Sequence, residues 1–111
     1  MEKEVLKGHL PILILGILAK RPLHGYALCE EIKALCSPGL SLGEGTLYPL
    51  LYRLERQGHL RSEWEESPSG KERKVYRVTR SGRKLIQSHR EDWRTLSAAF
   101  QTILGEDWVL S

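Results

Sequence analysis

The sequence predicts a mainly α-helical fold with one small β-hairpin. Three observations predict it. Segments with helical apolar spacing fill the first half, two strand-like runs flank a turn-rich stretch in the second, and a long amphipathic segment follows. The chain of 111 residues, 41% hydrophobic and 28% charged, has the size and composition of one ordinary soluble domain.

An apolar run over residues 10–18 predicts the first helix, over residues 8–20, with Pro11 in its first turn. The run is shorter than the roughly 20 residues that span a bilayer. Lys20, Arg21 and Pro22 follow it directly, without the small residues of a signal-peptide cleavage site. We therefore expect a buried helix that ends at Arg21, no membrane segment, and a cytoplasmic protein.

Two further helices are predicted before the middle of the chain. The second covers residues 25–35, with Leu28, Ile32 and Leu35 as its core stripe, and residues 37–39 form a turn after it. The third covers residues 45–57 and stops at Gly58, which favours a left-handed conformation after a helix. Its core face consists of four leucines at helical spacing: Leu47, Leu50, Leu51 and Leu54.

Two strands, over residues 60–65 and 74–78, are expected to form a hairpin with residues 67–70 at its tip. Thr79 then caps a long fourth helix that runs to about residue 104. Three helices followed directly by a hairpin make a winged helix-turn-helix. We expect residues 1–79 to form that domain, and residues 80–111 to form a C-terminal dimerisation helix and tail.

The outward face of the third helix suits close approach to DNA. Small residues at its start let backbone N–H groups reach phosphates, tyrosine hydroxyls can donate to phosphates, and arginines can reach phosphates or a guanine edge. The predicted contacts on this helix are Gly45, Thr46, Tyr48, Pro49, Tyr52, Arg53 and Arg56. The alternative is an ordinary amphipathic surface helix with two partly buried tyrosines.

The positive charge is concentrated behind this helix. The net charge is +3, but residues 71–84 carry seven basic residues and one acidic residue, so the remainder of the chain is net negative. Lys71, Arg73 and Lys74 are expected at or beside the hairpin tip, where they would contact DNA. The alternative is a solvated basic loop. Glutamates on the first strand indicate that only the tip and the second strand approach DNA: Glu63, Glu65 and Glu66.

The fourth helix carries an apolar stripe that predicts a dimer. Ile86, Trp93, Leu96, Phe100 and Ile103 share one side, with heptad-like spacing from Trp93 onward. A helix of this length on a small domain needs a partner for such a stripe, and the simplest partner is a second copy. The alternative is a helix folded back on its own core. A two-fold dimer would read a near-palindromic operator with half-sites about one helical turn apart.

No feature of the sequence indicates an enzyme, a metal site or a cofactor. His9, His24, His59 and His89 show no metal-ligand spacing with Cys29 or Cys36, and no nucleophile has a matching base. We expect both cysteines to be reduced, buried thiols, although a thiol redox switch is the alternative.

Three motifs together resemble the PadR family of bacterial transcriptional regulators. They are Leu23-His24-Gly25-Tyr26, then Gly45-Thr46-Leu47-Tyr48-Pro49 with Leu54-Glu55 and Gly58, and then residues 73–79 with Gly82. The resemblance covers residues 6–104, and the single helix after the wing is similar to the small subclass of the family.

The resemblance implies a homodimeric repressor that binds double-stranded DNA and, in some members, is released by a small aromatic compound. It implies a DNA-contact role for Tyr48 and Pro49, and packing or a backbone contact for Tyr26. It also implies that Trp93 stacks on a flat effector at the dimer interface. The alternative function is a winged-helix protein-interaction module without specific DNA binding.

Overall fold

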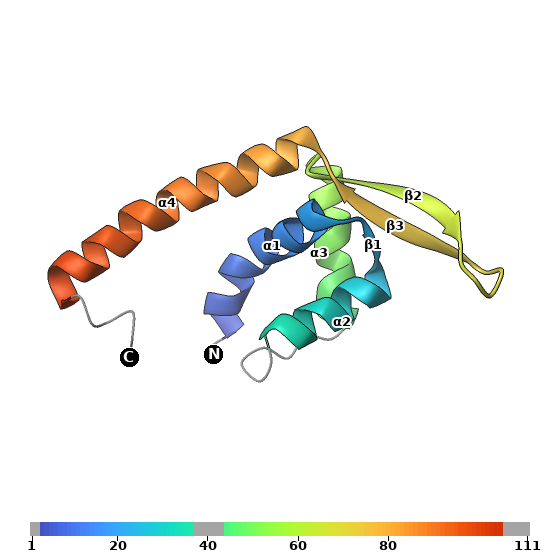
Figure 1. Ribbon diagram of the computed structural model, residues 1–111, viewed down its shortest axis with the longest axis horizontal. Coiled ribbons are helices and arrows are strands. Elements are labelled where there is room, and N and C mark those ends of the chain that lie inside the picture. Colours follow the sequence, from blue (N-terminus) through green and yellow to red (C-terminus); the bar gives the residue numbers. More distant parts are fainter. Residues whose placement is uncertain (1–2, 37–43, 106–111) are drawn as a thin grey trace.

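The computed structural model describes residues 3–36 and 44–105 of the chain. This part contains, in order, α1 (Lys3–Lys20), β1 (Leu23–His24), α2 (Gly25–Cys36), α3 (Glu44–Arg56), β2 (Leu60–Glu66), β3 (Glu72–Val78) and α4 (Arg80–Leu104). The first three helices pack together, the β2–β3 hairpin projects from one side, and α4 extends on the other (Figure 1). The fold is therefore a winged helix-turn-helix with a long C-terminal helix, as the sequence predicts.

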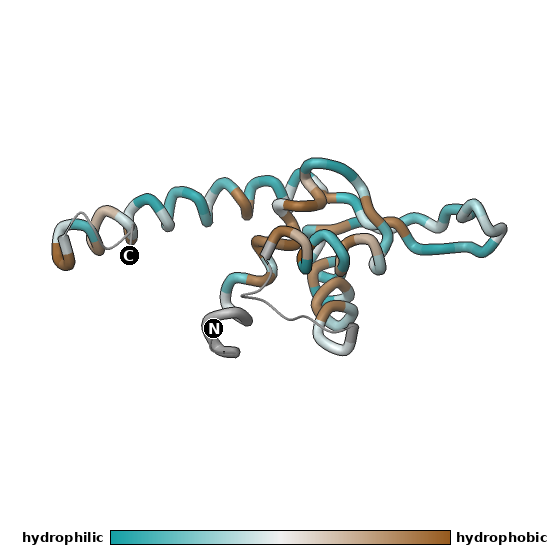
Figure 2. Tube along the Cα trace, turned by 60° about the horizontal axis from the view of Figure 1, so that its bottom comes forward, coloured by the Kyte–Doolittle hydropathy of each residue, from teal (hydrophilic) through white to brown (hydrophobic). Residues whose placement is uncertain are grey.

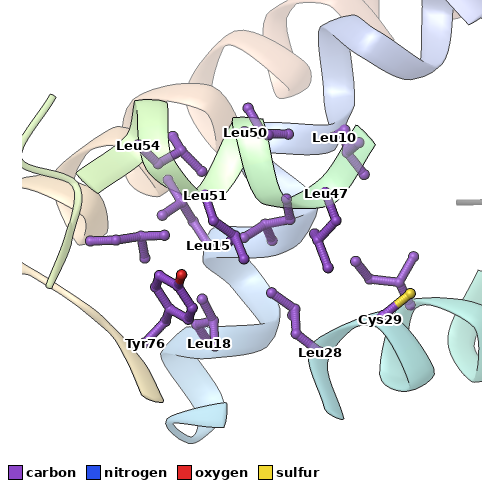
Figure 3. Packing of buried hydrophobic residues seen from close by; sticks show 13 residues of the cluster. Leu10, Leu15, Leu18, Leu28, Cys29, Leu47, Leu50, Leu51, Leu54 and Tyr76 are labelled. Atoms are coloured by element: carbon purple, nitrogen blue, oxygen red, sulfur yellow. The ribbon is translucent and has the colours of Figure 1, made fainter. Parts of the chain in front are cut away.

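The core lies where α1, α2 and α3 meet the base of the sheet. The four leucines predicted for the inner face of α3 are all buried, and they pack against α1 and α2 (Figure 3). Each fully buried leucine contributes roughly 1.5–3 kcal/mol relative to an exposed one. This face holds α3 firmly, so that its opposite face is left to solvent.

Two details of the helices differ from expectation. The helix α1 begins at Lys3, so Pro11 lies inside it and not in its first turn. Residues before Gly8 have good helix propensity and extend the helix, although Pro11 cannot donate a backbone hydrogen bond. Leu35 is 62% exposed and does not belong to the core. It lies in the last turn of α2, at the rim of a shallow groove that Ile17 and Glu31 also line. The turn expected at residues 37–39 lies outside the described residues.

The sheet contains a third strand that the sequence did not predict. Its order is β1-β3-β2, with antiparallel neighbours. The two residues of β1 pair with β3, Leu23 with Tyr76 and His24 with Val75. A strand of two residues has no periodicity to detect. This pairing attaches β3 of the wing to the two residues that immediately precede α2.

The junction between the wing and α4 is tightly packed. Thr79 caps α4 as predicted, since its hydroxyl oxygen accepts from the N–H of Gly82 at 3.1 Å. The same hydroxyl donates to the carbonyl oxygen of Gly58 at 2.6 Å, and Gly58 has the left-handed φ of +84° that was predicted. A methyl group at Gly82 would collide with the carbonyl oxygen of His59. The start of α4 is therefore attached to the turn after α3.

The helix α4 makes the molecule elongated. Its 25 residues extend roughly 37 Å. The radius of gyration is 16.0 Å, against about 13 Å for a compact chain of this length. Figure 2 shows the hairpin and most of α4 as hydrophilic, with hydrophobic residues again at the far end of α4. None of the described helices is long and apolar enough to cross a membrane.

Candidate nucleic-acid interface

The outward face of α3 is exposed along its whole length, as predicted. Its side chains carry hydroxyl and guanidinium donors, and the guanidinium of Arg56 lies 5.8 Å from the centre of the Tyr52 ring. That cation–π contact positions the Arg56 side chain without removing its charge. The exposed residues are those predicted: Gly45, Thr46, Tyr48, Pro49, Tyr52, Arg53 and Arg56.

These seven residues do not form one cluster. The Tyr48 ring lies against the backbone of Gly25, where a Cβ atom would be 2.6 Å from the Tyr48 hydroxyl oxygen. In contrast, Thr46, Pro49 and Arg53 line a groove of about 360 Å³ on the side of α3 that faces α1. One edge of α3 therefore faces the wing, and the other faces α1.

The wing holds part of its basic charge in internal ion pairs. Only Lys71 lies beside the tip, whereas Lys74 lies on β3, and its Nζ is 3.5 Å from the Glu55 carboxylate of α3. The expectation that Arg73 and Lys74 lie at or beside the tip is therefore wrong, because β3 begins at Glu72 and includes both residues, and because Glu55 and the Tyr76 ring hold the Lys74 ammonium near α3. On the same strand, Arg77 lies 3.7 Å from the carboxylates of Glu63 and Glu65.

Glu55 connects α3 to both long strands. One of its carboxylate oxygens accepts a hydrogen bond from the Ser62 hydroxyl of β2, and the other pairs with Lys74 of β3. A carboxylate shared in this way orients the wing relative to the exposed face of α3. Glu55 was part of the family-like motif, but its positioning role was not predicted.

Between α2, α3 and the wing is a pocket of about 420 Å³ that the sequence did not predict. Rings and cations from four separate segments line it: His24, Gly25, Tyr26, Tyr48, Trp64, Arg73, Lys74 and Tyr76. The Nε atom of Arg73 is buried and, within the described part of the chain, has no hydrogen-bond partner. Trp64 lies exposed at this pocket, but its exposure is known from the structure and has no signal in the sequence.

Two groups in the pocket have shifted pKa values. Burial, and secondarily the charge of Arg73, lowers the pKa of His24 below its ordinary 6.5. The neutral imidazole accepts a hydrogen bond at Nδ1 from the N–H of Ala27, at 3.3 Å, in the first turn of α2. Burial, followed by Glu55 and Tyr48, raises the pKa of Tyr76, which keeps its phenol protonated. The pocket therefore contains neutral rings and two cations.

The stripe predicted for α4 divides into two parts. Ile86 is partly buried against the core, so the first turns of α4 are covered by the chain itself. Farther along, Trp93 and Leu96 are about half exposed, and Trp93 meets the edge of the His9 ring at 6.4 Å between centres. The last turns form an entirely apolar groove of about 220 Å³ lined by Leu96, Ala99, Phe100, Ile103 and Leu104.

The described residues contain no cluster of three or more His, Cys, Asp or Glu side chains that could hold a metal ion. Cys29 is buried in the hydrophobic core, as expected. The side chain of Cys36 lies outside the described residues.

Residues 14–88 match the Transcriptional regulator PadR-like family. The chain belongs to the PadR family. Members of this family are transcriptional regulators and not enzymes, and PadR regulators bind DNA. The match begins in the middle of α1 and extends into α4, so it includes the whole wing.

Relatives resemble this PadR protein over most of its length. It is 36% identical over 103 residues to the transcriptional regulator Rv3488 of Mycobacterium tuberculosis, covering 93% of this chain and 90% of that protein. The crystal structure of a PadR family regulator from Eggerthella lenta is 36% identical, with a TM-score of 0.79 and coverage of 93% of this chain and 88% of that one. A PadR-like transcription factor from Bacteroides fragilis is 33% identical, with a TM-score of 0.78 and coverage of 90% and 94%.

Proposed function

We propose that this PadR regulator is a homodimeric repressor that binds a near-palindromic operator through α3 and the wing of each copy. The observation that carries the proposal is the orientation of α3. Its leucine face is buried, so that its tyrosines and arginines face outward beside a basic hairpin. Repression requires access to the chromosome, which in a bacterial cell is in the cytoplasm.

Each copy would contact both strands of a half-site. Tyrosine hydroxyls and the arginines of α3 donate to phosphates at the edge of the major groove, and Lys71 approaches the backbone from the wing tip. We predict that residues 1–79 bind DNA and that residues 80–111 form the contact with the second copy.

Binding to a duplex from the region upstream of the gene tests this proposal by fluorescence anisotropy. We expect preference for that duplex over random DNA, and affinity that falls steeply with salt. Tyr48→Ala and Arg56→Ala should each weaken binding about a hundredfold, because each removes one charged or polar contact of about tenfold from both copies of the dimer. The melting temperature should stay unchanged for Arg56→Ala, whose side chain is exposed, and fall only slightly for Tyr48→Ala, whose ring is partly covered by Gly25. The matched control, Arg94→Ala, removes a charge from an exposed position in the middle of α4.

Equal affinity for upstream and random DNA would count against specific repression. An equal loss of binding and thermal stability in Tyr48→Ala would mean that the residue supports the fold and not the interface. Complete absence of DNA binding, with a stable complex formed with another protein, would favour the protein-interaction module instead.

Trp93 favours an additional role in sensing a flat aromatic effector. Its ring is half exposed on the apolar stripe of α4, where a second copy would complete a pocket. Saturable quenching of tryptophan emission by a planar aromatic compound should disappear in Trp93→Phe. Because Trp64 and Trp108 also emit, quenching that persists in this variant would exclude the site at Trp93.

A further inference from the structure

We propose that the pocket between α2, α3 and the wing binds one backbone phosphate of DNA together with its adjoining sugar. Arg73 and the hydroxyl of Tyr26 would hold the phosphate, and the ring of Trp64 would pack against the sugar. This assignment rests on the proposed DNA-binding function. It adds Trp64 to the interface and gives Tyr26 and Arg73 a defined partner.

Arg73 differs from the neighbouring cations of β3. The ammonium of Lys74 is paired with Glu55, and the guanidinium of Arg77 lies between Glu63 and Glu65. No salt bridge of the described residues includes Arg73, and its buried Nε has no acceptor. Because no carboxylate among the described residues pairs with it, the Arg73 guanidinium keeps its positive charge for an anion in the pocket. A guanidinium also matches the geometry of a phosphate, to which it can donate two hydrogen bonds.

The rings at the mouth of the pocket suit a sugar–phosphate unit. Tyr26 is 60% exposed and Trp64 is 66% exposed, although both are large aromatic side chains. A tyrosine hydroxyl donates to phosphate oxygens, while an indole face covers the apolar side of a sugar. The first turn of α2 begins beside them at Gly25 and contains no acidic residue, so its positive end is not neutralised.

The position of the pocket favours DNA over a small ligand. It lies between Tyr48 on α3 and the strands of the wing, so a DNA strand that passes from one contact to the other must cross it. Small-molecule sites bury about 70–90% of their ligand's surface. A pocket whose flanking rings are more than half exposed does not enclose a ligand to that extent.

Neutral methylphosphonate linkages, placed one at a time along the upstream duplex, test the proposal. With the wild-type chain, we expect one position in each half-site at which the substitution weakens binding about tenfold. Arg73→Ala removes this contact from both copies of the dimer, so it should weaken binding to the unmodified duplex by roughly the square of that factor, about a hundredfold, and be insensitive to the substitution at that position. Tyr26→Phe, which removes a single exposed hydroxyl, should bind the unmodified duplex several-fold more weakly. It should also be less sensitive than the wild type to the substitution at that position and unchanged in its sensitivity elsewhere.

Arg61→Ala is the matched control, since Arg61 is exposed on β2 and lies outside the pocket lining. This variant should retain full sensitivity to every methylphosphonate. If Arg73→Ala also retains full sensitivity while the wild type binds DNA normally, the pocket assignment is wrong and the proposed function stands. If the wild type binds neither the upstream duplex nor random DNA, the pocket assignment and the proposed function both fail.

A small aromatic acid is the competing occupant. The probe is 4-hydroxybenzoate, added to a Trp93→Phe, Trp108→Phe chain in which Trp64 is the remaining tryptophan. We expect no saturable quenching of its emission. Saturable quenching that is lost in Arg73→Ala, with DNA binding unaffected by that variant, would assign the pocket to such a ligand and overturn the proposal.

Discussion

Gly25 affects the interface through the ring that lies on it. A Cβ atom at this position would be 2.6 Å from the Cε1 and hydroxyl oxygen of Tyr48. The collision is with the end of a side chain, so the Tyr48 ring would move and the backbone would stay. Alanine also favours a helix by up to about 1 kcal/mol over glycine. Gly25→Ala should therefore leave the free energy of unfolding unchanged or slightly raised, while DNA affinity falls about tenfold.

Denaturant unfolding and anisotropy titration measure the two quantities separately. Gly16→Ala is the control, because a Cβ atom at Gly16 meets no atom within 4 Å and the residue lies within α1. It should raise stability slightly without changing DNA affinity. Undiminished DNA binding by Gly25→Ala would show that the position of Tyr48 is unimportant for the interface.

His24 makes stability depend on pH. Burial and Arg73 lower its pKa, so the folded chain binds the imidazole proton more weakly than the unfolded chain does. Protonation therefore favours unfolding. The contribution of His24 is fully present above its ordinary pKa of 6.5 and is lost as the pH falls below that value. His24→Asn supplies an oxygen to accept from Ala27 but does not titrate. Between pH 7 and 5, wild-type stability should fall more than that of His24→Asn, and parallel urea-unfolding midpoints would contradict this.

Burial on α3 could be predicted at the residue scale because it follows from spacing within one helix. Leu47 and Leu51 are buried, and Tyr52 is exposed, as the period of 3.6 residues requires. Spacing was insufficient for Leu35, whose burial depends on whether a neighbouring element reaches the end of α2. The pocket could not be predicted at all, because His24 and Arg73 meet only through the pairing of β1 with β3.

At the scale of elements, the far end of α4 provides the sharpest prediction. Leu96 is 50% exposed in the single copy, so a charge there leaves the fold of one copy intact. In a dimer that covers the apolar groove, the same charge would be buried without a partner, at a cost of several kcal/mol. Leu96→Glu should therefore sediment as a monomer at micromolar concentration, whereas the wild type sediments as a dimer. Gln101→Glu, exposed on the same helix, should remain dimeric. A monomeric wild type would contradict the dimer itself.

The elements themselves were largely predictable because glycine, proline and threonine mark their ends. Gly58 ends α3 and Thr79 begins α4, in agreement with the capping preferences of these residues. The exceptions were the short β1 and the early start of α1. Neither has a local signal, since β1 exists only through its partner strand and no breaking residue precedes Gly8 closely.

For the whole molecule, the internal ion pairs set how strongly salt acts on DNA binding. Each phosphate contact contributes about 0.9 to the slope of log affinity against log salt concentration. Lys71→Ala should lower the slope of a dimer by about two, one contact for each copy. Lys74→Ala should change it little, because Glu55 already neutralises that ammonium. Equal changes for both variants, measured by anisotropy between low and moderate salt, would show that the Lys74–Glu55 pair opens on DNA.

The attachment of α4 has a mechanical consequence. Its first turn is joined to the end of α3 through Thr79 and Gly58, whereas its far end projects freely from its own domain. A tilt of about ten degrees at this joint, which would also shift Trp93 against His9 of α1, would move the far end of a helix roughly 37 Å long by about 6 Å. The helix α4 would therefore pivot about its first turn, which lies beside the recognition helix α3. In a dimer joined at the far ends, a small repacking there would change the separation of the two recognition helices, and spreading of those helices by DNA would act back on the joint.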